Sequence, residues 1–371
     1  MKKLSILLSI HFFILLTGCA STCMEYRSAT TAARSEKDLK RAEEWGLKAM
    51  VSPECNPATN AHAPYFLATE VYLQQKKYTE MATMLDLAEK RNPDQPLEIP
   101  FKLGDTPIET TIEGVEAFRD QEWTKVYNKA VDYIQKDKID RAKKQIETAI
   151  LIHPQKEENY LTLAAIHMQN NDLDAALTTA NRGLDANDES SVLYELKADI
   201  LLQTNPDISK MESANELYQI AIKYSDNSGP IKIKLLNIFI ELGHNEKAID
   251  FADNLLNQYP NDPNIYYNVG VVYLRMAKEI QDRSKIKYNE LNNIERPTEN
   301  IIRELYSDFK QLRKYASFSK DYFYEALDLE QKEKLDTKNA IAEMKLAINQ
   351  MDNIFIPSIR ETARLASIEL E

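Results

Sequence analysis

Histidine and cysteine, which often serve as bases, nucleophiles or metal ligands, are few in this chain of 371 residues. The five histidines stand far apart in the sequence: His11, His62, His153, His167 and His244. None belongs to an H-E-x-x-H motif, and the chain has no G-x-S-x-G elbow, P-loop or glycine-rich dinucleotide turn. Carboxylates are abundant, so a glycosidase-type pair stays open as an alternative. We expect a protein that is not an enzyme and that holds no cofactor and no metal.

The N-terminal segment has the layout of a secretory signal. Lys2 and Lys3 precede a largely apolar stretch of 13 residues, Leu4 to Leu16. A transmembrane helix needs about 20 residues, so this stretch is too short to span a bilayer comfortably. A positive start followed by a short apolar core predicts a signal over residues 1–18.

The end of this segment, Leu16-Thr17-Gly18-Cys19, resembles the lipoprotein box of bacteria. The resemblance implies that the chain is cut before Cys19 and that Cys19 carries the lipid. Ala20 stands where an Asp would resemble a signal for retention in the inner membrane. The resemblance therefore implies an anchor in the outer membrane with the body in the periplasm. In a Gram-positive host it would imply the outer face of the plasma membrane.

Two further cysteines, Cys23 and Cys55, would meet an oxidising compartment after export. We expect them to open and close one helical hairpin, which would bring them close enough for a disulfide. Two unpaired thiols remain an alternative. A metal site is disfavoured because no histidine or further cysteine stands at ligand spacing.

The body of the chain repeats with a period of about 34 residues. Large and small residues recur along it, as in Tyr160, Leu163, Ala164 and His167, followed by Leu173, Ala176, Ala180 and Gly183. The pattern recurs one period forward at Tyr194, Ala198 and Leu201, and one period back at Val126, Ala130 and Tyr133. Two antiparallel helices cross closely only where one of them presents a small side chain. This pattern resembles the tetratricopeptide repeat.

The resemblance implies an all-α fold, an α-solenoid of about seven helix-turn-helix pairs. We predict an N-terminal pair of repeats over residues 19–95, a joint and helix extension over 96–122, and a C-terminal array over 123–333. Pro96 and Pro100 interrupt the pattern, Leu103 to Pro107 reads as a turn, and a helix is expected to restart near Pro107. A long loop covering the groove or an edge is the alternative for this joint.

The last repeat departs from the pattern because its first helix continues to about Ile294 and its second runs from about Glu299 to Glu330. We therefore predict a long helical hairpin over residues 279–318, which either projects toward a partner or folds back on the solenoid. Residues 334–371 are expected to form amphipathic helices that cap the last pair. Occupation of the chain's own groove by these helices is the alternative.

The family resemblance also implies which residues bind a ligand, because the first helix of each pair lines the concave face. In this sequence those positions hold Tyr127, Val131, Ile134, Leu161, Ala165, Met168, Ile233, Asn237, Ile240, Tyr267, Val271 and Leu274. They are mostly apolar, and the Lys, Arg and Asn clamp with which some members hold a terminal carboxylate is absent. The expected ligand is an apolar helix or extended segment. Closure of part of this face by neighbouring helices or the C-terminus is the alternative.

The acidic composition narrows the choice of partners. Lys and Arg number 46 against 58 for Asp and Glu, which gives a net charge of −12. Nucleic acids and anionic lipid surfaces are thereby disfavoured. The sequence favours a lipid-anchored scaffold or adaptor that binds proteins of the bacterial cell envelope. The alternatives are a subunit of an outer-membrane assembly or export machine and a cell-wall glycan enzyme.

Overall fold

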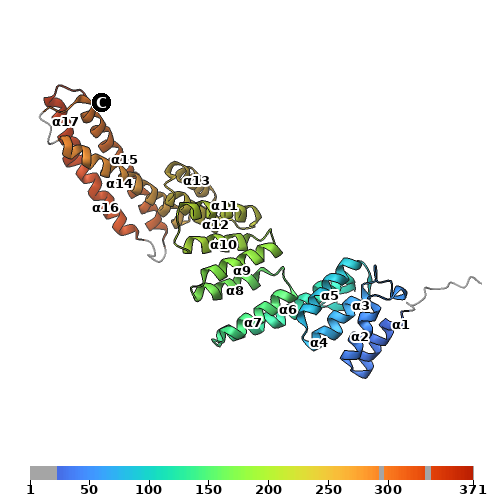
Figure 1. Ribbon diagram of the computed structural model, residues 1–371. Coiled ribbons are helices and arrows are strands. Elements are labelled where there is room, and N and C mark those ends of the chain that lie inside the picture. Colours follow the sequence, from blue (N-terminus) through green and yellow to red (C-terminus); the bar gives the residue numbers. More distant parts are fainter. Residues whose placement is uncertain (1–22, 292–295, 331–335, 371) are drawn as a thin grey trace, which may run out of the picture. The chain divides into compact units, whose positions relative to one another are not determined.

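The computed structural model describes residues 23–291, 296–330 and 336–370. Within these ranges the chain is almost wholly helical, with one two-stranded antiparallel sheet, so the predicted all-α class is confirmed (Figure 1). The signal segment and Cys19 lie outside the described residues. None of the described helices is long and apolar enough to cross a membrane. Two compact units, residues 1–166 and 167–371, divide inside one helix.

Unit 1 consists of short antiparallel helix pairs and a hairpin. Its helices are α1 (Met24–Thr31) with η1 (Ala32–Glu36), α2 (Leu39–Ala49), η2 (Pro53–Cys55), α3 (His62–Phe66) with η3 (Leu67–Tyr72) and α4 (Leu73–Gln75), α5 (Tyr78–Arg91), α6 (Thr111–Gln135), α7 (Ile139–Ile152) and most of α8 (Glu157–Gln169). Side-chain caps help to fix the helix starts, since Asp38 accepts the backbone N–H of Arg41 before α2.

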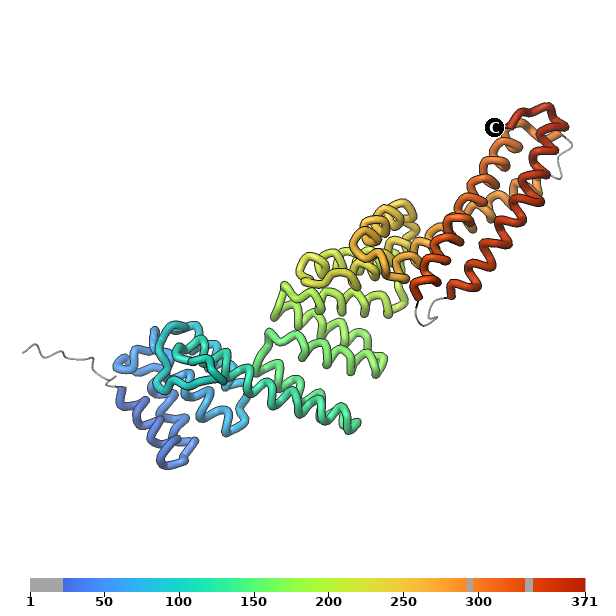
Figure 2. The backbone as a smooth tube through the Cα atoms, turned by 180° about the vertical axis from the view of Figure 1, so that it is seen from behind, coloured from blue at the N-terminus to red at the C-terminus, as the bar shows by residue number. Residues whose placement is uncertain are grey.

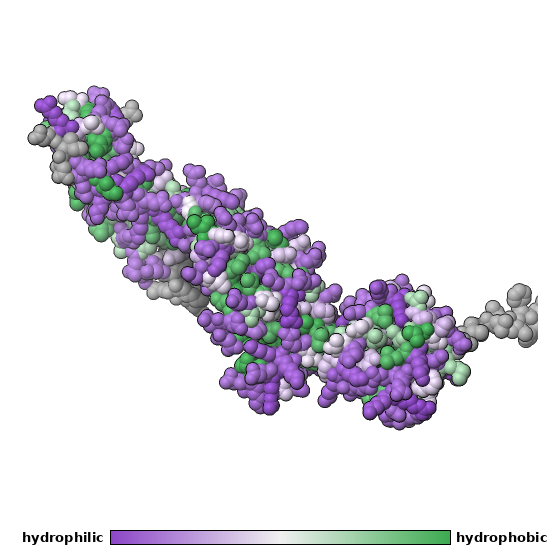
Figure 3. Space-filling view, viewed as in Figure 1, coloured by the Kyte–Doolittle hydropathy of each residue, from purple (hydrophilic) through white to green (hydrophobic). Residues whose placement is uncertain are grey.

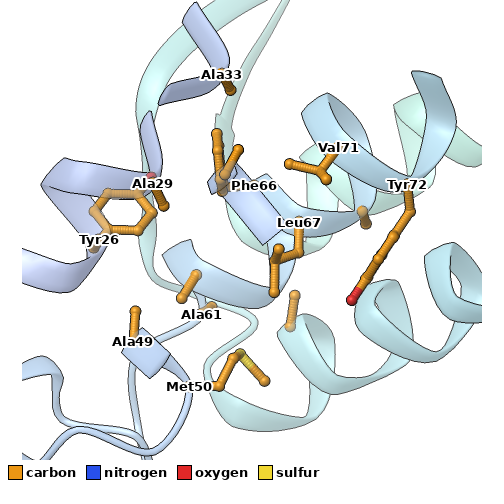
Figure 4. Packing of buried hydrophobic residues seen from close by; sticks show 14 of the residues in the cluster. Tyr26, Ala29, Ala33, Ala49, Met50, Ala61, Phe66, Leu67, Val71 and Tyr72 are labelled. Carbon is orange, nitrogen blue, oxygen red and sulfur yellow. The ribbon is translucent and has the colours of Figure 1, made fainter. Parts of the chain in front are cut away.

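In the core of unit 1, small residues pack against large ones where the helices cross (Figure 4). Gly46 of α2 is an example, because a Cβ placed there would lie 2.5 Å from Cδ2 of Leu67. Tyr26 packs edge-on against Phe66 with 5.8 Å between ring centroids, and Ala29 beside it is fully buried. Small residues at the crossings therefore set the helix spacing, which is the physical basis of the pattern in the sequence.

A disulfide joins Cys23, at the start of α1, to Cys55, in the turn after α2, with 4.7 Å between their Cα atoms. The bond connects the two ends of the first helix pair, which is the pairing that the sequence analysis favoured. Glu25 lies close to both sulfur atoms. Sulfur atoms in a disulfide are not thiolate ligands, so this cluster does not form a zinc site.

The predicted joint at residues 96–122 contains a β-hairpin, which the sequence analysis did not foresee. Strand β1 (Pro96–Leu103) pairs with β2 (Thr106–Thr110), and α6 begins at Thr111 instead of near Pro107. Thr110 and Glu113 form a capping box that fixes this start. Pro96, Pro100 and Pro107 fit in these strands because a two-stranded sheet consists of edge strands, where a missing N–H costs little. Leu97 and Ile108 attach the hairpin to Ala117 within unit 1.

Acid is expected to destabilise unit 1 through His153, which is buried at the end of α7. Burial and the neighbouring charge of Lys156 lower the pKa of His153 in the folded chain below its ordinary value of 6.5. The unfolded chain then binds a proton more readily, so the free energy of unfolding decreases as the pH falls below about 6.5. The variant His153→Gln should lose this part of the pH dependence.

Urea unfolding followed by tryptophan fluorescence at several pH values tests this prediction, because Trp45 and Trp123 both lie in unit 1. His244→Gln, in unit 2, is the matched control and should leave the pH dependence of this signal unchanged. An identical pH dependence in the wild type and in His153→Gln would contradict the assignment.

Unit 2 stacks further pairs and ends in longer helices. It contains the end of α8, α9 (Leu173–Ala186), α10 (Ser191–Gln203), α11 (Ile208–Tyr224), α12 (Gly229–Glu241), α13 (Asn245–Gln258), α14 (Pro263–Leu291), α15 (Glu299–Leu329), α16 (Thr337–Gln350), η4 (Met351–Phe355) and α17 (Ile356–Leu365). The number of repeats, and the domain bounds drawn from them, stay predictions.

The long hairpin consists of α14 and α15, and α15 begins at Glu299, where the second helix was expected. Its helices α14 and α15 run antiparallel over their full lengths, and their far ends extend away from α9–α13 (Figure 2). Ile294, expected near the end of the first helix, lies outside the described residues. On the polar side of the contact between α14 and α15, Asp308 accepts hydrogen bonds from Arg283 at 2.7 Å and from Ser284 at 3.3 Å.

The C-terminal helices pack along α15, the last helix of the last pair, which is the place expected of a cap. Their apolar residues Met351, Ile356 and Ile359 join the cluster that contains Leu305 and Phe309 of α15. The long hairpin is therefore part of a small bundle.

Candidate binding groove

Side chains about one repeat apart in the sequence meet in space. In unit 2, Asp199 of α10 pairs with Lys234 of α12, and Glu241 of α12 pairs with Arg275 of α14, at separations of 35 and 34 residues. In unit 1 the corresponding contacts join Arg34 to Glu70, Glu43 to Lys77, Trp123 to Asn159 and Tyr127 to Thr162. Equivalent positions of successive helices thus lie side by side, as stacking of similar pairs requires.

A pocket of about 410 Å³ lies in unit 2 where α10, α11 and α12 meet. Its walls combine apolar and polar side chains: Asp199, Leu202, Pro206, Met211, Tyr218, Lys234, Asn237, Ile238 and Glu241. We call it the groove pocket. It contains Asn237, one of the residues that the sequence analysis assigned to the concave face.

A network of paired charges supports the groove pocket. Lys234 donates to Asp199 at 2.6 Å, and its Nζ also lies 2.7 Å from a carboxylate oxygen of Glu195. Tyr218 donates to the other oxygen of Asp199 at 2.6 Å. The cation at the pocket is thus neutralised by its own neighbours, so the pocket presents no free positive charge to an acidic ligand.

The pKa values agree with this geometry. Burial and the bond to Asp199 raise the pKa of Tyr218 well above its ordinary value, so the phenol stays protonated and acts as a donor. Burial disfavours the charged form of Lys234, but its bonds to Asp199 and Glu195 outweigh this, and the pKa of Lys234 is raised. Both groups therefore keep one protonation state at neutral pH, which makes the network a fixed support and not a proton-transfer device.

The predicted concave-face residues fall in both units. Tyr127, Val131, Ile134, Leu161 and Ala165 belong to unit 1. Met168, Ile233, Asn237, Ile240, Tyr267, Val271 and Leu274 belong to unit 2. Most are half-buried, and Ala165 and Asn237 are exposed. Each unit thus has its own group, and only Asn237 lines the groove pocket.

Ile240 is a correction to that prediction. Its side chain is 3% exposed and belongs to the core of unit 2, while its carbonyl accepts from Arg275 at 2.8 Å. Tyr267 is partly covered as well, since its ring lies 5.4 Å from that of Phe323 on α15. Neighbouring helices therefore close part of the predicted face, which was the stated alternative.

Sequence reasoning missed Lys234, Tyr218 and Met211 as groove residues. Tyr218 lies on the second helix of its pair and not on the first, but its hydroxyl reaches Asp199. Lys234 could have been found from its charge, which is opposite to that of Asp199 one repeat earlier. Met211 lies just after the loop between α10 and α11, where a local insertion obscures the repeat register.

Residues 133–200 match the family model of the tetratricopeptide repeat. This part of the chain consists of tetratricopeptide repeats. The match covers α7, α8 and α9 with parts of α6 and α10, and the same stacking continues into α12 and α14. No curated protein sequence matches the chain.

Several solved structures are similar to this chain at low sequence identity. The MamA protein is 16% identical and covers 57% of this chain and 96% of its own, with a TM-score of 0.39. A tetratricopeptide repeat protein from Parabacteroides merdae is 14% identical and covers 86% of this chain and 99% of its own, with a TM-score of 0.35. PilW, a type IV pilus biogenesis factor, is 14% identical and covers 60% and 99%, with a TM-score of 0.36.

Proposed function

We propose that the protein is a lipid-anchored adaptor of the bacterial cell envelope that binds an apolar helix or extended segment of a partner protein. The observation that carries the proposal is the groove pocket, whose apolar walls lie beside charges that already pair with one another. Contact of an apolar ligand with such a surface is favourable, because apolar area is removed from water. The pocket offers no free cation that would require an acidic ligand. The tetratricopeptide repeats supply the stacked helices that such a groove needs.

The surface as a whole is mostly polar. Polar and charged side chains cover most of the visible face, and apolar side chains gather in small patches (Figure 3). Small apolar patches are common on protein surfaces, so the binding role rests on the groove pocket and not on the composition of the surface. The envelope location rests on the resemblance of Leu16-Thr17-Gly18-Cys19 to a lipoprotein box.

A photo-crosslinking amino acid at position 237 tests the binding site in living cells, because Asn237 is exposed and lines the groove pocket. We expect an adduct with a discrete envelope protein. Position 246 is the control, since Glu246 is exposed on α13 outside the pocket. The same adducts at both positions, or none at position 237, would count against the groove.

The anchor needs a separate experiment. Labelling with radioactive palmitate should mark the wild-type chain and not the variant Cys19→Ala, which should leave the membrane fraction. Labelling that persists in the variant would show that the anchor is elsewhere or absent, without bearing on the groove.

A further inference from the structure

The C-terminal bundle of unit 2 contains a cavity that is separate from the groove pocket. It measures about 320 Å³ and lies between α14, α15 and the junction of α16 with the π-helix η4. In the bundle α14 packs along α15, and α16 packs along α15 as well (Figure 1). We call this cavity the bundle pocket. Its lining consists of Gln281, Lys285, Tyr288, Asn289, Phe309, Leu312, Gln350, Met351 and Phe355.

The inner wall of the bundle pocket is apolar and largely aromatic. Phe309, Leu312 and Met351 are buried, with exposures of 3%, 1% and 2%. The ring of Tyr288 meets those of Phe309 and Phe355 edge to face, with 5.9 and 5.3 Å between ring centroids. Phe309 and Phe355 are 5.2 Å apart. Such a wall suits a flat aromatic ligand, because aromatic rings favour edge-to-face and offset contacts with one another.

Polar side chains stand at the rim of the bundle pocket. Gln281 and Lys285 are exposed on α14, and Gln350 is half-buried at the end of α16. Within residues 23–291, 296–330 and 336–370, the side chains of these three residues make no hydrogen bond or ion pair. A ligand can therefore accept hydrogen bonds from two amides and one ammonium group without breaking a bond inside the protein.

The rim carries one positive charge. Among the described residues that line the bundle pocket, Lys285 alone is charged. Two acids on the neighbouring elements do not neutralise it, since Asp308 of α15 pairs with Arg283 and Asp352 of η4 pairs with Arg313. The bundle pocket thus combines an apolar interior with a single cation at its opening.

We propose that the bundle pocket binds a small aromatic carboxylate. Entry of the ring removes apolar area of both partners from water, and the carboxylate remains at the rim beside Lys285. A phosphate monoester carries a charge of about −1.5 to −2 at neutral pH, which one lysine does not balance. The proposal is independent of the adaptor role, because none of its residues lines the groove pocket.

The size of the bundle pocket favours a small molecule over a segment of a partner protein. Pockets for small molecules measure about 300–1,000 Å³ and often lie between the helices of a bundle, so this cavity belongs to the small end of that range. A peptide helix would need an open groove along several turns.

Isothermal titration calorimetry with naphthalene-2-carboxylate and the purified full chain in detergent tests the proposal, after subtraction of a titration into detergent alone. We expect saturable binding at one site. Naphthalene-2-carboxamide has nearly the same shape without the charge, and it should bind about threefold to fivefold more weakly, as expected for the loss of one partly exposed ion pair.

Lys285→Gln removes the cation and keeps a polar side chain at the rim. This variant should bind the carboxylate about threefold to fivefold more weakly and should bind the carboxamide like the wild type. Phe355→Ala removes part of the aromatic wall and should weaken the binding of both compounds. Lys314→Gln is the matched control, since Lys314 is exposed on α15 and does not line the bundle pocket.

Circular dichroism should show that all three variants are folded, and Lys314→Gln should bind both compounds like the wild type. Absence of saturable binding to the wild type would overturn the proposal, as would equal affinities of the wild type for the carboxylate and the carboxamide. An equal loss in Lys285→Gln and Lys314→Gln would also contradict it. Tighter binding of a short peptide that ends in phenylalanine would overturn it in favour of the C-terminus of a partner protein.

Discussion

Replacement of Phe323 by alanine is expected to lower the free energy of unfolding of unit 2 by about 3–5 kcal/mol, as is typical when a fully buried aromatic side chain is truncated. Phe323 is 0% exposed on α15, where its ring fills the space beside Gly270 of α14. Alanine would leave a cavity at the crossing of the two longest helices. The two helices cannot easily move to fill this cavity. Ser319 of α15 donates a hydrogen bond to the carbonyl of Gly270 at 2.8 Å, which fixes the distance between the two backbones.

Urea unfolding followed by circular dichroism tests this prediction in the full chain. Tryptophan fluorescence, which reports unit 1 alone, should show an unchanged transition in the same samples. Phe318→Ala is the control on the same helix, since Phe318 is 38% exposed and should cost clearly less. An equal loss in both variants would show that burial at Gly270 does not set the stability of the hairpin.

Gly270→Ala sharpens the test because it changes the other side of the same contact. A Cβ at position 270 would lie 2.8 Å from ring carbons of Phe323, so the single variant should be destabilised. In the background of Phe323→Ala the ring is gone, and the same change should cost less. A double-mutant cycle should therefore give a coupling energy between the two sites, as expected for residues in contact.

This contact illustrates why the architecture could be predicted from the sequence. Gly270 and Phe323 follow the rule behind the repeat pattern, because a small residue must meet a large one where two helices cross. The start of α15 near Glu299 could also be predicted, since Thr298 accepts the N–H of Ile301 as a helix cap and Pro297 marks the turn before it.

The parts that escaped prediction depend on contacts between residues far apart in the chain. The strands β1 and β2 follow no clear alternation of apolar and polar residues, and only Leu97 and Ile108 among them are buried. Prolines at positions 96 and 100 indicate a helix break but do not distinguish a loop from a hairpin. The packing of Leu97 and Ile108 on Ala117, which holds the β-hairpin in place, is seen only in the structure.

The groove pocket follows the same rule. It was predicted in part because Asn237 occupies a repeat position. Its charge network could not be predicted, because it depends on the hydroxyl of Tyr218 reaching from α11 to Asp199 of α10.

Removal of the disulfide is expected to lower the free energy of unfolding of unit 1 by about 3–4 kcal/mol, because the bond restricts the unfolded chain. Cys23 and Cys55 are separated by 32 residues, and the loop between them contains the whole first helix pair. In the folded state both cysteines are buried, with 1% and 2% exposure, so serine replacements would also place a hydroxyl in the core. Cys23→Ala with Cys55→Ala avoids that added cost.

Tryptophan fluorescence during urea unfolding measures this effect in unit 1. Circular dichroism reports the helices of both units, and the part of its transition that fluorescence does not show should stay unchanged as an internal reference. The alanine pair should unfold at a lower urea concentration than the oxidised wild type and should match the wild type in the presence of a reductant. The single variant Cys55→Ala should behave like the pair, since one cysteine cannot form the bond. The wild type could instead unfold at the same urea concentration with and without reductant, and at the same concentration as the alanine pair. This result would show that the disulfide does not stabilise the first helix pair. Its stability would then come from the packing of residues such as Gly46 and Leu67.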